Sequence, residues 1–239
     1  MIASKDPMGA AIAEYFKTGT AGRLRVLSPD FDEDTIPVET LFRTFGQMPA
    51  LEQTALRLAE GRILDVGAGA GCHSLALKDM GKTVDSIDIS PLSVETMTAR
   101  GVPNAMELDF WMVEEKYDTV LMMMNGIGIV GTVSELPRFF HHIGRILGDG
   151  GQVLLDSSDI CYLYEFEEGI IELPSTGYYG EIRYQMKYRK IKNHLMIQMK
   201  FKINKMMMDY RKIKKNLIKK SSLTCSVMTS DCYVSYILC

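Results

Sequence analysis

Several signals that assign proteins to specialised classes are missing from this sequence. It has five cysteines, none in a CxxC pair, and an odd number fits reduced thiols better than a disulfide framework. The stretch MIASKDPMGAAIAEYFK at the N-terminus lacks the long apolar core of a signal peptide. No apolar run reaches the ~20 residues that span a bilayer. We therefore expect a cytoplasmic protein without a membrane partner.

Charge of one sign is also lacking. Lys and Arg number 27 against 30 Asp and Glu, so the net charge is −3 and the whole-chain basic field of many nucleic-acid binders is absent. No set of His, Cys, Asp and Glu has the spacing of a metal site, and we expect no metal. What is present is 46% hydrophobic and 24% charged residues over 239 positions. This predicts a globular protein of one domain, or one domain with an added lobe.

Strand-like and helix-like segments alternate over about residues 60–160. The expected strands are near-continuous apolar runs, as in a parallel sheet covered by helices on both faces. The pattern therefore predicts an α/β fold with a doubly wound, mostly parallel sheet. The expected strands are 62–67, 83–90, 104–110, 116–125 and 152–158, and the expected helices between them are 72–81, 91–101 and 134–151.

The first 60 residues have a different pattern. Helical spacing of apolar residues predicts one helix over 7–17 and two short amphipathic helices over 38–48 and 49–61. An acidic, proline-bounded loop is expected over 28–37. We therefore expect this region to be helical and irregular.

A glycine-rich loop follows the first expected strand. A phosphate-binding P-loop would end in GKS or GKT, and this loop continues GCHS without lysine. A dinucleotide loop, GxGxxG, would need a third glycine where Cys72 stands, and Asp65 would repel a pyrophosphate. S-adenosylmethionine, which carries ammonium and sulfonium charges, would be attracted to Asp65. An NAD-dependent oxidoreductase is correspondingly disfavoured.

Three motifs resemble those of the Rossmann-like (class I) S-adenosylmethionine-dependent methyltransferases, small bacterial type. ILDVGAGAGCHSLAL resembles their first motif, VDSIDISP the second and MELDF the third, and the resemblance covers about residues 62–159. It implies a Rossmann-like methyltransferase sheet with a helical lid over 1–60 and an S-adenosylmethionine-binding core over 61–190. It also implies S-adenosyl-L-methionine as the cofactor.

The resemblance further implies roles for the first motif. Gly67, Ala68, Gly69 and Gly71 would let the backbone approach the cofactor where a Cβ would clash. The following helix N-terminus would attract the methionine carboxylate. Asp65 would lie near the ammonium group.

The later strand ends receive implied roles in the same way. Asp88 would accept hydrogen bonds from the ribose hydroxyls, and Ile89 would pack on the adenine. Asp109 would accept from the adenine amino group, with Phe110 beside it, and Asn125 would lie near the methyl-donating end. Asp109 has a competing interpretation as a surface acid.

Some neighbouring residues have interpretations of their own. Met122, Met123 and Met124 are expected to be core filler rather than cofactor contacts. His73, in the first turn of the loop helix, is a weaker candidate for the site. Of the adjacent His141 and His142, one is expected to be exposed and neither to be a ligand.

The acceptor is indicated only by its class. A sulfonium donor is already activated, so catalysis by positioning needs no diagnostic residue, and the catalytic residues stay unknown. The stretch NGIGIVG stands where many amino-group methyltransferases of DNA and protein have an Asn-Pro-Pro-Tyr-type motif, which favours a small-molecule acceptor. Alternatives are a catalytically inactive S-adenosylmethionine-binding protein and an RNA methyltransferase. Candidates on the acceptor side are Tyr15, Arg43, Asp156, Tyr178 and Tyr179.

The segment 191–239 does not fit the family pattern. It contains nine lysines, and the chain has no glycine after Gly180 and no proline after Pro174. One interpretation is a divergent C-terminal region with a solvated Lys-rich helix. Another is a segment translated out of frame, which would leave the sheet edge unfinished. A third is a basic tail that binds nucleic acid, which the absence of a recognisable binding module disfavours. The sequence does not indicate an oligomeric state.

Overall fold

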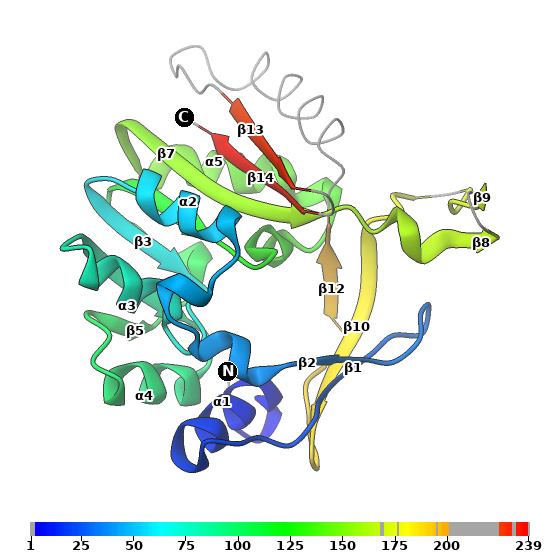
Figure 1. Cartoon of the computed structure of the whole chain (residues 1–239). Coiled ribbons are helices and arrows are strands. Elements are labelled where there is room, and N and C mark those ends of the chain that lie inside the picture. Colours follow the sequence, from blue (N-terminus) through cyan, green and yellow to red (C-terminus); the bar gives the residue numbers. More distant parts are fainter. Residues whose placement is uncertain are drawn as a thin grey trace.

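The main element of the fold is a seven-stranded sheet with the order β13-β14-β7-β6-β3-β4-β5 (Figure 1). The structure is a computed structural model that describes residues 3–167, 170–175, 177–194, 196–200, 225–230 and 233–238. Strands β3 to β7 are parallel, and β14 is antiparallel to both β7 and β13. The strands are β3 (Arg62–Val66), β4 (Thr83–Asp88), β5 (Ala105–Glu107), β6 (Tyr117–Met122), β7 (Leu147–Ser158), β13 (Cys225–Ser230) and β14 (Tyr233–Leu238).

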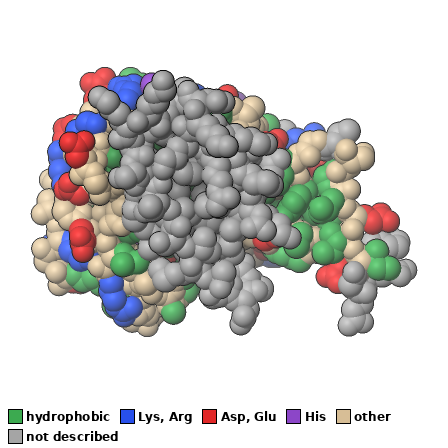
Figure 2. Space-filling model, turned by 90° about the horizontal axis from the view of Figure 1, so that it is seen from above, with side chains coloured by type: hydrophobic (Ala, Val, Ile, Leu, Met, Phe, Trp, Pro, Cys, Tyr) green, Lys and Arg blue, Asp and Glu red, His purple; other side chains and the backbone are tan. Residues whose placement is uncertain are grey.

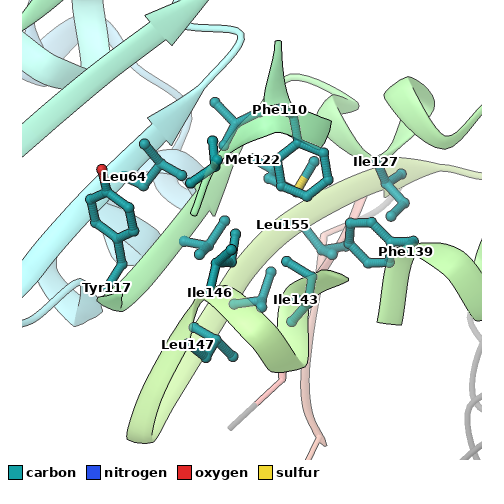
Figure 3. Packing of buried hydrophobic residues seen from close by; sticks show 14 of the residues in the cluster. Leu64, Phe110, Tyr117, Met122, Ile127, Phe139, Ile143, Ile146, Leu147 and Leu155 are labelled. Atoms are coloured by element: carbon teal, nitrogen blue, oxygen red, sulfur yellow. The ribbon is translucent and has the colours of Figure 1, made fainter. Parts of the chain in front are cut away.

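Both faces of this sheet are buried, which explains the near-continuous apolar strands. Successive side chains of a strand point to opposite faces. Adjacent residues accordingly enter different hydrophobic clusters on the two faces: Ile63 and Leu64, Val120 and Leu121, and Leu154 and Leu155. On one face Phe139 and Ile143 of α5 pack against Met122 and Leu155 (Figure 3), and α2 and α3 cover the other. The predicted doubly wound α/β sheet is confirmed.

The helices begin and end where the sequence provides caps. In α1 the Asp6 side chain accepts from the Gly9 amide at 2.8 Å, and Pro7 occupies the first turn. In α4 the Ser90 side chain accepts from the Ser93 amide at 2.9 Å, and Pro91 follows the cap. The helices are α1 (Pro7–Thr18), α2 (Ala50–Leu58), α3 (Cys72–Asp79), α4 (Pro91–Ala99) and α5 (Leu136–Ile146).

A second sheet makes the prediction of a purely helical and irregular N-terminal region wrong. Strands β1 and β2 of that region pair antiparallel, and β1 also pairs with β10 from the far end of the chain. The Gly22 amide donates to the Tyr188 hydroxyl across a separation of 166 positions. Such long-range pairing leaves no periodic signal in a strand of three or four residues. The strands are β1 (Leu24–Leu27), β2 (Asp34–Ile36), β10 (Glu181–Tyr188), β11 (Ile191–Lys192) and β12 (Met196–Met199).

The helix predicted over 38–48 is also wrong, because two short 3₁₀ turns replace it. They are η2 (Val38–Phe42) and η3 (Phe45–Gln47). Between them Arg43 has extended backbone angles, φ −62° and ψ 150°. Thr44 then starts the second turn, where it forms a reciprocal capping box with Gln47. The break directs the Arg43 side chain toward α2 instead of along a helix.

A small arm projects from the body beyond the end of β7 (Figure 1). It contains η7 (Cys161–Tyr164), β8 (Glu165–Glu167) and β9 (Ile170–Ile171). Apolar side chains gather on one side of the molecule (Figure 2). In the arm itself Tyr162, Ile170 and Ile171 are exposed. Within the described ranges, no helix has the length and apolar character needed to span a membrane. The remaining 3₁₀ turns are η1 (Ala3–Lys5), η4 (Phe110–Met112), η5 (Gly126–Val130) and η6 (Val133–Glu135).

The C-terminal hairpin occupies the edge of the main sheet. The backbone of β14 pairs with β7 from Ser158 to Val153, and β13 pairs with β14 on the outside. Residues 201–224, which hold most of the Lys-rich segment, lie outside the described residues. The edge is thus occupied by the described strands, and the out-of-frame hypothesis for 191–239 stays a prediction.

Helix α1 is held on α4 by a buried hydrogen bond between their caps. The Ser90 hydroxyl donates to the second carboxylate oxygen of Asp6 at 2.5 Å, and Asp6 is 1% exposed. The close approach needs glycine at position 9. A Cβ there would lie 2.2 Å from the Ser90 hydroxyl and 2.3 Å from the Asp6 carboxylate. This contact fixes α1 beside the carboxyl end of β4.

We expect Gly9→Ala to lower the free energy of unfolding by about 1–3 kcal/mol, because the new methyl group overpacks the α1–α4 contact. Urea titration monitored by circular dichroism measures this change. Gly144→Ala in the exposed part of α5 is the matched control, since a Cβ there meets nothing within 4 Å. The control should be neutral or more stable by up to about 1 kcal/mol. Equal destabilisation of both variants would contradict the tight contact.

Candidate functional site

The glycine loop between β3 and α3 presents backbone to an open space. Gly67 and Gly69 have φ values of +69° and +59°, a left-handed conformation that favours glycine. A Cβ at Gly67 would meet nothing within 4 Å, and one at Gly69 would meet only the tip of Ile12 and the Gly67 carbonyl near 4 Å. The Gly67 and Ala68 amides donate to the Ile87 carbonyl at 2.9 and 3.1 Å. The loop is thereby fixed to β4 while its outer side stays free for a ligand.

Asp88, at the end of β4, holds this loop and the start of α4 together. Its two carboxylate oxygens accept from the Gly69 amide at 2.9 Å and the Ser90 amide at 2.8 Å. Burial raises the pKa of Asp88, and the two amide hydrogen bonds oppose that rise. A carboxylate oxygen can accept more than one hydrogen bond, so Asp88 can still accept from a ligand.

A cavity of about 740 Å³ lies between the carboxyl ends of the main sheet and the second sheet. Its volume falls in the range of about 300–1,000 Å³ typical of small-molecule sites. The glycine loop and the ends of β4, β6 and β7 form one side, and α1, η2 and α2 contribute to the rim. The opposite wall is formed by side chains of the second sheet: Val26, Asp34, Ile36, Tyr184, Met186, Met196 and Gln198.

Most of the residues predicted to bind the cofactor line this cavity. They are Asp65, Gly67, Ala68, Gly69, Asp88, Ile89, Phe110 and Asn125. The structure thus brings them together, and their individual contacts stay predictions.

Gly71 and Asp109 are not part of the cavity lining. A Cβ at Gly71 would lie 2.5 Å from Val102, so this glycine allows α3 and α4 to pack closely. Asp109 is exposed, and its carboxylate accepts from the Trp111 amide at 3.0 Å at the start of η4. Both positions have a structural explanation that the motif comparison did not provide.

Asp65 is a buried carboxyl behind the glycine loop. It is 2% exposed and accepts from the Ser74 hydroxyl at 2.6 Å. Burial raises its pKa, while the nearby His73 and the Ser74 hydrogen bond oppose the rise. A positively charged ligand in the cavity would stabilise the ionised form further.

The ends of β6 and β7 are joined by Asn125 and Asp156. The backbone amide of Asn125 donates to the Asp156 carboxylate at 2.6 Å. The side-chain oxygen of Asn125 accepts from the backbone amide of Ser158 at 2.8 Å. Asn125 adopts a left-handed conformation with φ 61°. Asp156 is 4% exposed, and burial raises its pKa to about 6. Asn125 is therefore a bridge between strands, and Asp156 is a titratable group at the cavity.

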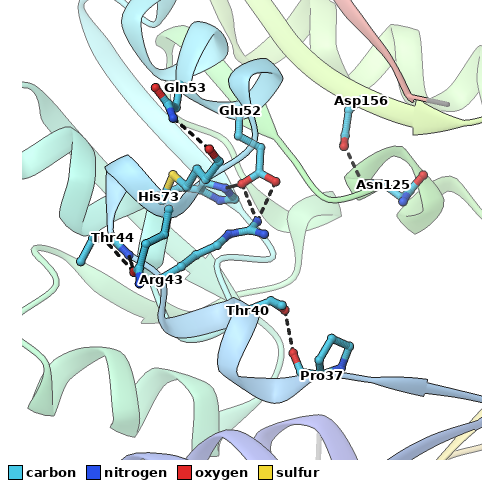
Figure 4. A network of polar contacts seen from close by, with 11 residues as sticks. Pro37, Thr40, Arg43, Thr44, Glu52, Gln53, His73, Asn125 and Asp156 are labelled. Atoms are coloured by element: carbon cyan, nitrogen blue, oxygen red, sulfur yellow. Dashed lines mark hydrogen bonds and ion pairs between the residues drawn. The ribbon is translucent and has the colours of Figure 1, made fainter. Parts of the chain in front are cut away.

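A three-residue network next to these strand ends was not identified from the sequence (Figure 4). One guanidinium nitrogen of Arg43 donates to both Glu52 oxygens at 2.6 Å, and His73 Nε2 lies 2.7 Å from Glu52 Oε2. Burial would raise the pKa of Glu52. The His73 hydrogen bond and the charges of His73 and Arg43 outweigh burial and keep it below its ordinary value. The three residues come from separate elements, so no sequence spacing predicts the network.

Of the five residues predicted on the acceptor side, two line the cavity and three do not. Arg43 and Asp156 line the cavity. Tyr15 stacks on Phe42 with ring centroids 4.6 Å apart, and the Tyr179 hydroxyl donates to Asp159 at 2.7 Å. Tyr178 packs against the hydrophobic cluster under α5. The three tyrosines are not part of the cavity lining.

The expectation for the three methionines after β6 is only partly correct. Met122 and Met123 are both buried in the core, but Met123 and Met124 also line the cavity, because the strand ends at Met122 and the chain turns across its edge. His141 is exposed, and His142 is buried with Nε2 2.8 Å from the Phe110 carbonyl oxygen. The described part of the chain contains no group of three His, Cys, Asp or Glu residues placed to hold a metal ion.

The fold and site define a Rossmann-like enzyme whose glycine loop and strand-end carboxylates suit a nucleoside that carries positive charge. A family described as a methyltransferase domain matches residues 42–197, and the chain belongs to that family. It is a methyltransferase that uses S-adenosylmethionine. Among proteins with curated descriptions, no sequence matches the chain.

Solved structures agree with this assignment. The chain is similar to a S-adenosylmethionine-dependent methyltransferase from Bacteroides fragilis, solved in complex with S-adenosyl-L-homocysteine. The identity is 41%, the match covers 100% of this chain and 96% of that one, and the TM-score is 0.89. DhpI in its SAM–HEP complex (14% identity, 79% and 83% covered, TM-score 0.58) shares the fold. So does the CcbJ methyltransferase from Streptomyces caelestis (13%, 82% and 98%, TM-score 0.53).

We expect Asp88→Ala to weaken binding of S-adenosylhomocysteine at least about tenfold, because hydrogen bonds to a charged group are worth about 1.5–3 kcal/mol each. Calorimetric titration measures the change. Asp109→Ala is the comparison, since its carboxylate is exposed and outside the cavity lining. A loss in Asp109→Ala equal to that in Asp88→Ala would instead support the predicted adenine contact of Asp109.

Asp156→Asn should become increasingly stable relative to the wild type as the pH rises. The pKa of Asp156 is about 6 in the folded protein and lower in the unfolded chain, so ionisation opposes folding. The cost begins above the unfolded pKa and is complete above about pH 6, and asparagine does not bear it. Urea unfolding should show the stability difference widening by about 1–2 kcal/mol between pH 5 and pH 8. A difference independent of pH would contradict the raised pKa.

Proposed function

We propose that the methyl acceptor is a small molecule that enters the cavity beneath the second sheet. The observation that carries this proposal is the covered carboxyl edge of the main sheet. Side chains of β1, β2, β10 and β12 lie opposite the glycine loop, on the other side of a cavity of about 740 Å³. A nucleic-acid duplex or a folded protein would need an open surface at this position. We extend the proposal to a cytoplasmic location, which the odd set of five cysteines supports.

The residues of the donor half fit the chemistry of S-adenosylmethionine. Gly67 and Gly69 leave backbone exposed where side chains would occupy the cavity, and the small side chain of Ala68 lines it between them. In our proposal Asp88 accepts from the ribose hydroxyls, and Asp65 lies near the ammonium group. Ile89, which is 38% exposed and lines the cavity, offers an apolar surface to the adenine. When bound, the donor supplies a methyl group on a positively charged sulfur.

Phe110 and Asn125 have supporting roles in this proposal. Phe110 is 1% exposed and packs against Phe139 and His142, so it can close the cavity beside the adenine. Asn125 has its side-chain oxygen bonded to β7, so its contribution is to shape the backbone near the methyl-donating end.

The acceptor half combines charges of both signs in a largely apolar space. Lys200 lines the cavity, and burial lowers its pKa while the charges of Asp34 and Asp156 oppose that change. Burial raises the pKa of Tyr184 on the opposite wall. Because these groups lie on strands or, for Lys200, directly after one, they can orient a polar small molecule and exclude water around the transferred methyl group.

Binding and turnover together test this proposal. We expect calorimetric titration to show micromolar binding of S-adenosylmethionine and S-adenosylhomocysteine and no binding of NADH. We then expect S-adenosylhomocysteine to form with a mixture of small hydroxyl and amine compounds, measured by mass spectrometry, and not with total RNA or a cell-protein extract. Turnover with RNA alone would contradict the small-molecule acceptor and favour the nucleic-acid alternative.

A further inference from the structure

The Arg43–Glu52–His73 network lines the same cavity as the glycine loop. All three residues line the cavity, and His73 and Glu52 are 5% and 6% exposed. Replacing buried ion pairs by apolar residues is often neutral or stabilising, so burial of these charges is weak evidence for a structural purpose. Arg43 Nε is also buried without a hydrogen bond. A buried charged network in a cavity wall costs stability, which suggests that it has a chemical role.

The network fixes which tautomer the neutral imidazole of His73 adopts. The ionised Glu52 carboxylate only accepts hydrogen bonds, so the 2.7 Å contact requires a proton on His73 Nε2. A neutral imidazole carries one proton, and Nδ1 then has a free lone pair. Within the described part of the chain Nδ1 has no hydrogen-bond partner. It is also not among the unpartnered atoms sealed from solvent, which in that part are Arg43 Nε and Ser93 Oγ. Nδ1 is therefore open to the cavity that His73 lines.

We propose that His73 is the general base of the methyl transfer and that Glu52, held by Arg43, is its positioning residue. The inference rests on the proposed small-molecule acceptor and narrows it to one whose nucleophilic atom carries a proton, a hydroxyl or an amine. As the acceptor oxygen or nitrogen bonds to the methyl carbon, the carbon–sulfur bond breaks and its electron pair stays on sulfur. The acceptor proton moves to His73 Nδ1, and the resulting imidazolium is stabilised by Glu52.

Charged groups on every neighbouring element bear on this histidine. Glu52 approaches from α2, Arg43 from the link between η2 and η3, and Asp65 from the end of β3. Asp156, at the end of β7, also acts electrostatically with His73 and lines the same cavity. Asp156 is the competing base, because burial raises its pKa to about 6 although the hydrogen bond from the Asn125 backbone amide opposes that rise.

The tautomer of His73 gives a test that needs no acceptor. Nitrogen-15 spectra of the full chain bound to S-adenosylhomocysteine resolve the four histidines, and His73→Gln identifies the signal of His73. At a pH where His73 is neutral, we expect the proton on Nε2 and none on Nδ1. A proton on Nδ1 would overturn the proposal. His73→Gln should still bind S-adenosylhomocysteine, so failure of the tautomer test is distinct from failure of the cofactor site.

Kinetics test the catalytic role with the hydroxyl or amine compound that supports turnover. We expect His73→Gln to lower kcat about 100-fold or more, the range of general-base catalysis, with little change in KM for S-adenosylmethionine. Glu52→Gln should lower kcat less, and added imidazole should partly restore His73→Gln. His141→Gln, which alters an exposed histidine of α5, is the matched control and should be unchanged. Full activity of His73→Gln, with activity lost in Asp156→Asn, would overturn the proposal in favour of Asp156.

Discussion

The site depends on a continuous set of hydrogen bonds centred on Asp88. Its carboxylate binds the Gly69 amide of the cofactor loop and the Ser90 amide at the start of α4. The Ser90 hydroxyl then donates to Asp6, which caps α1. The glycine loop, the strand end and α1 are therefore placed relative to one another by two carboxylates, the half-buried Asp88 and the buried Asp6. A ligand that hydrogen-bonds Asp88 would act on all three elements at once.

The fixed position of α1 determines where the second sheet can stand. The β1 strand is the next element after α1, and it pairs antiparallel with β10 on one side and with β2 on the other. Farther along, β12 packs against η5, where a Cβ at Gly128 would lie 2.5 Å from Gln198. The second sheet is thus held at both ends of the cavity, by α1 on one side and by the turn after β6 on the other. This explains how a wall built from distant segments can have a defined distance from the glycine loop.

The parts of the fold that the sequence predicts are those with local signals. The loop from Asp65 to Gly71 joins a strand and a helix in one short stretch, and the carboxyl ends of parallel strands must meet at one edge. Asp88 and Asn125 could therefore be placed in the site without a structure. The second sheet and the Glu52–His73 pair arise from contacts between distant segments, and neither has a spacing that a single sequence reveals. Asp109 shows the opposite case, because a motif position that looked functional caps a 3₁₀ turn.

In our proposal, local contacts form the part of the cavity that binds the methyl donor, and distant contacts form the part that binds the acceptor. The donor half is made by consecutive strand ends of the main sheet, whose geometry is the same for any acceptor. The acceptor half is made by groups brought from the second sheet, from the break at Arg43 and from α2. Here a charged network is kept in an apolar wall, where each charge raises the cost of leaving another unpaired. Such a wall is selective because an acceptor must satisfy its polar groups as well as fit its shape. In our proposal, specificity for the acceptor therefore resides in the elements that the family motifs do not include.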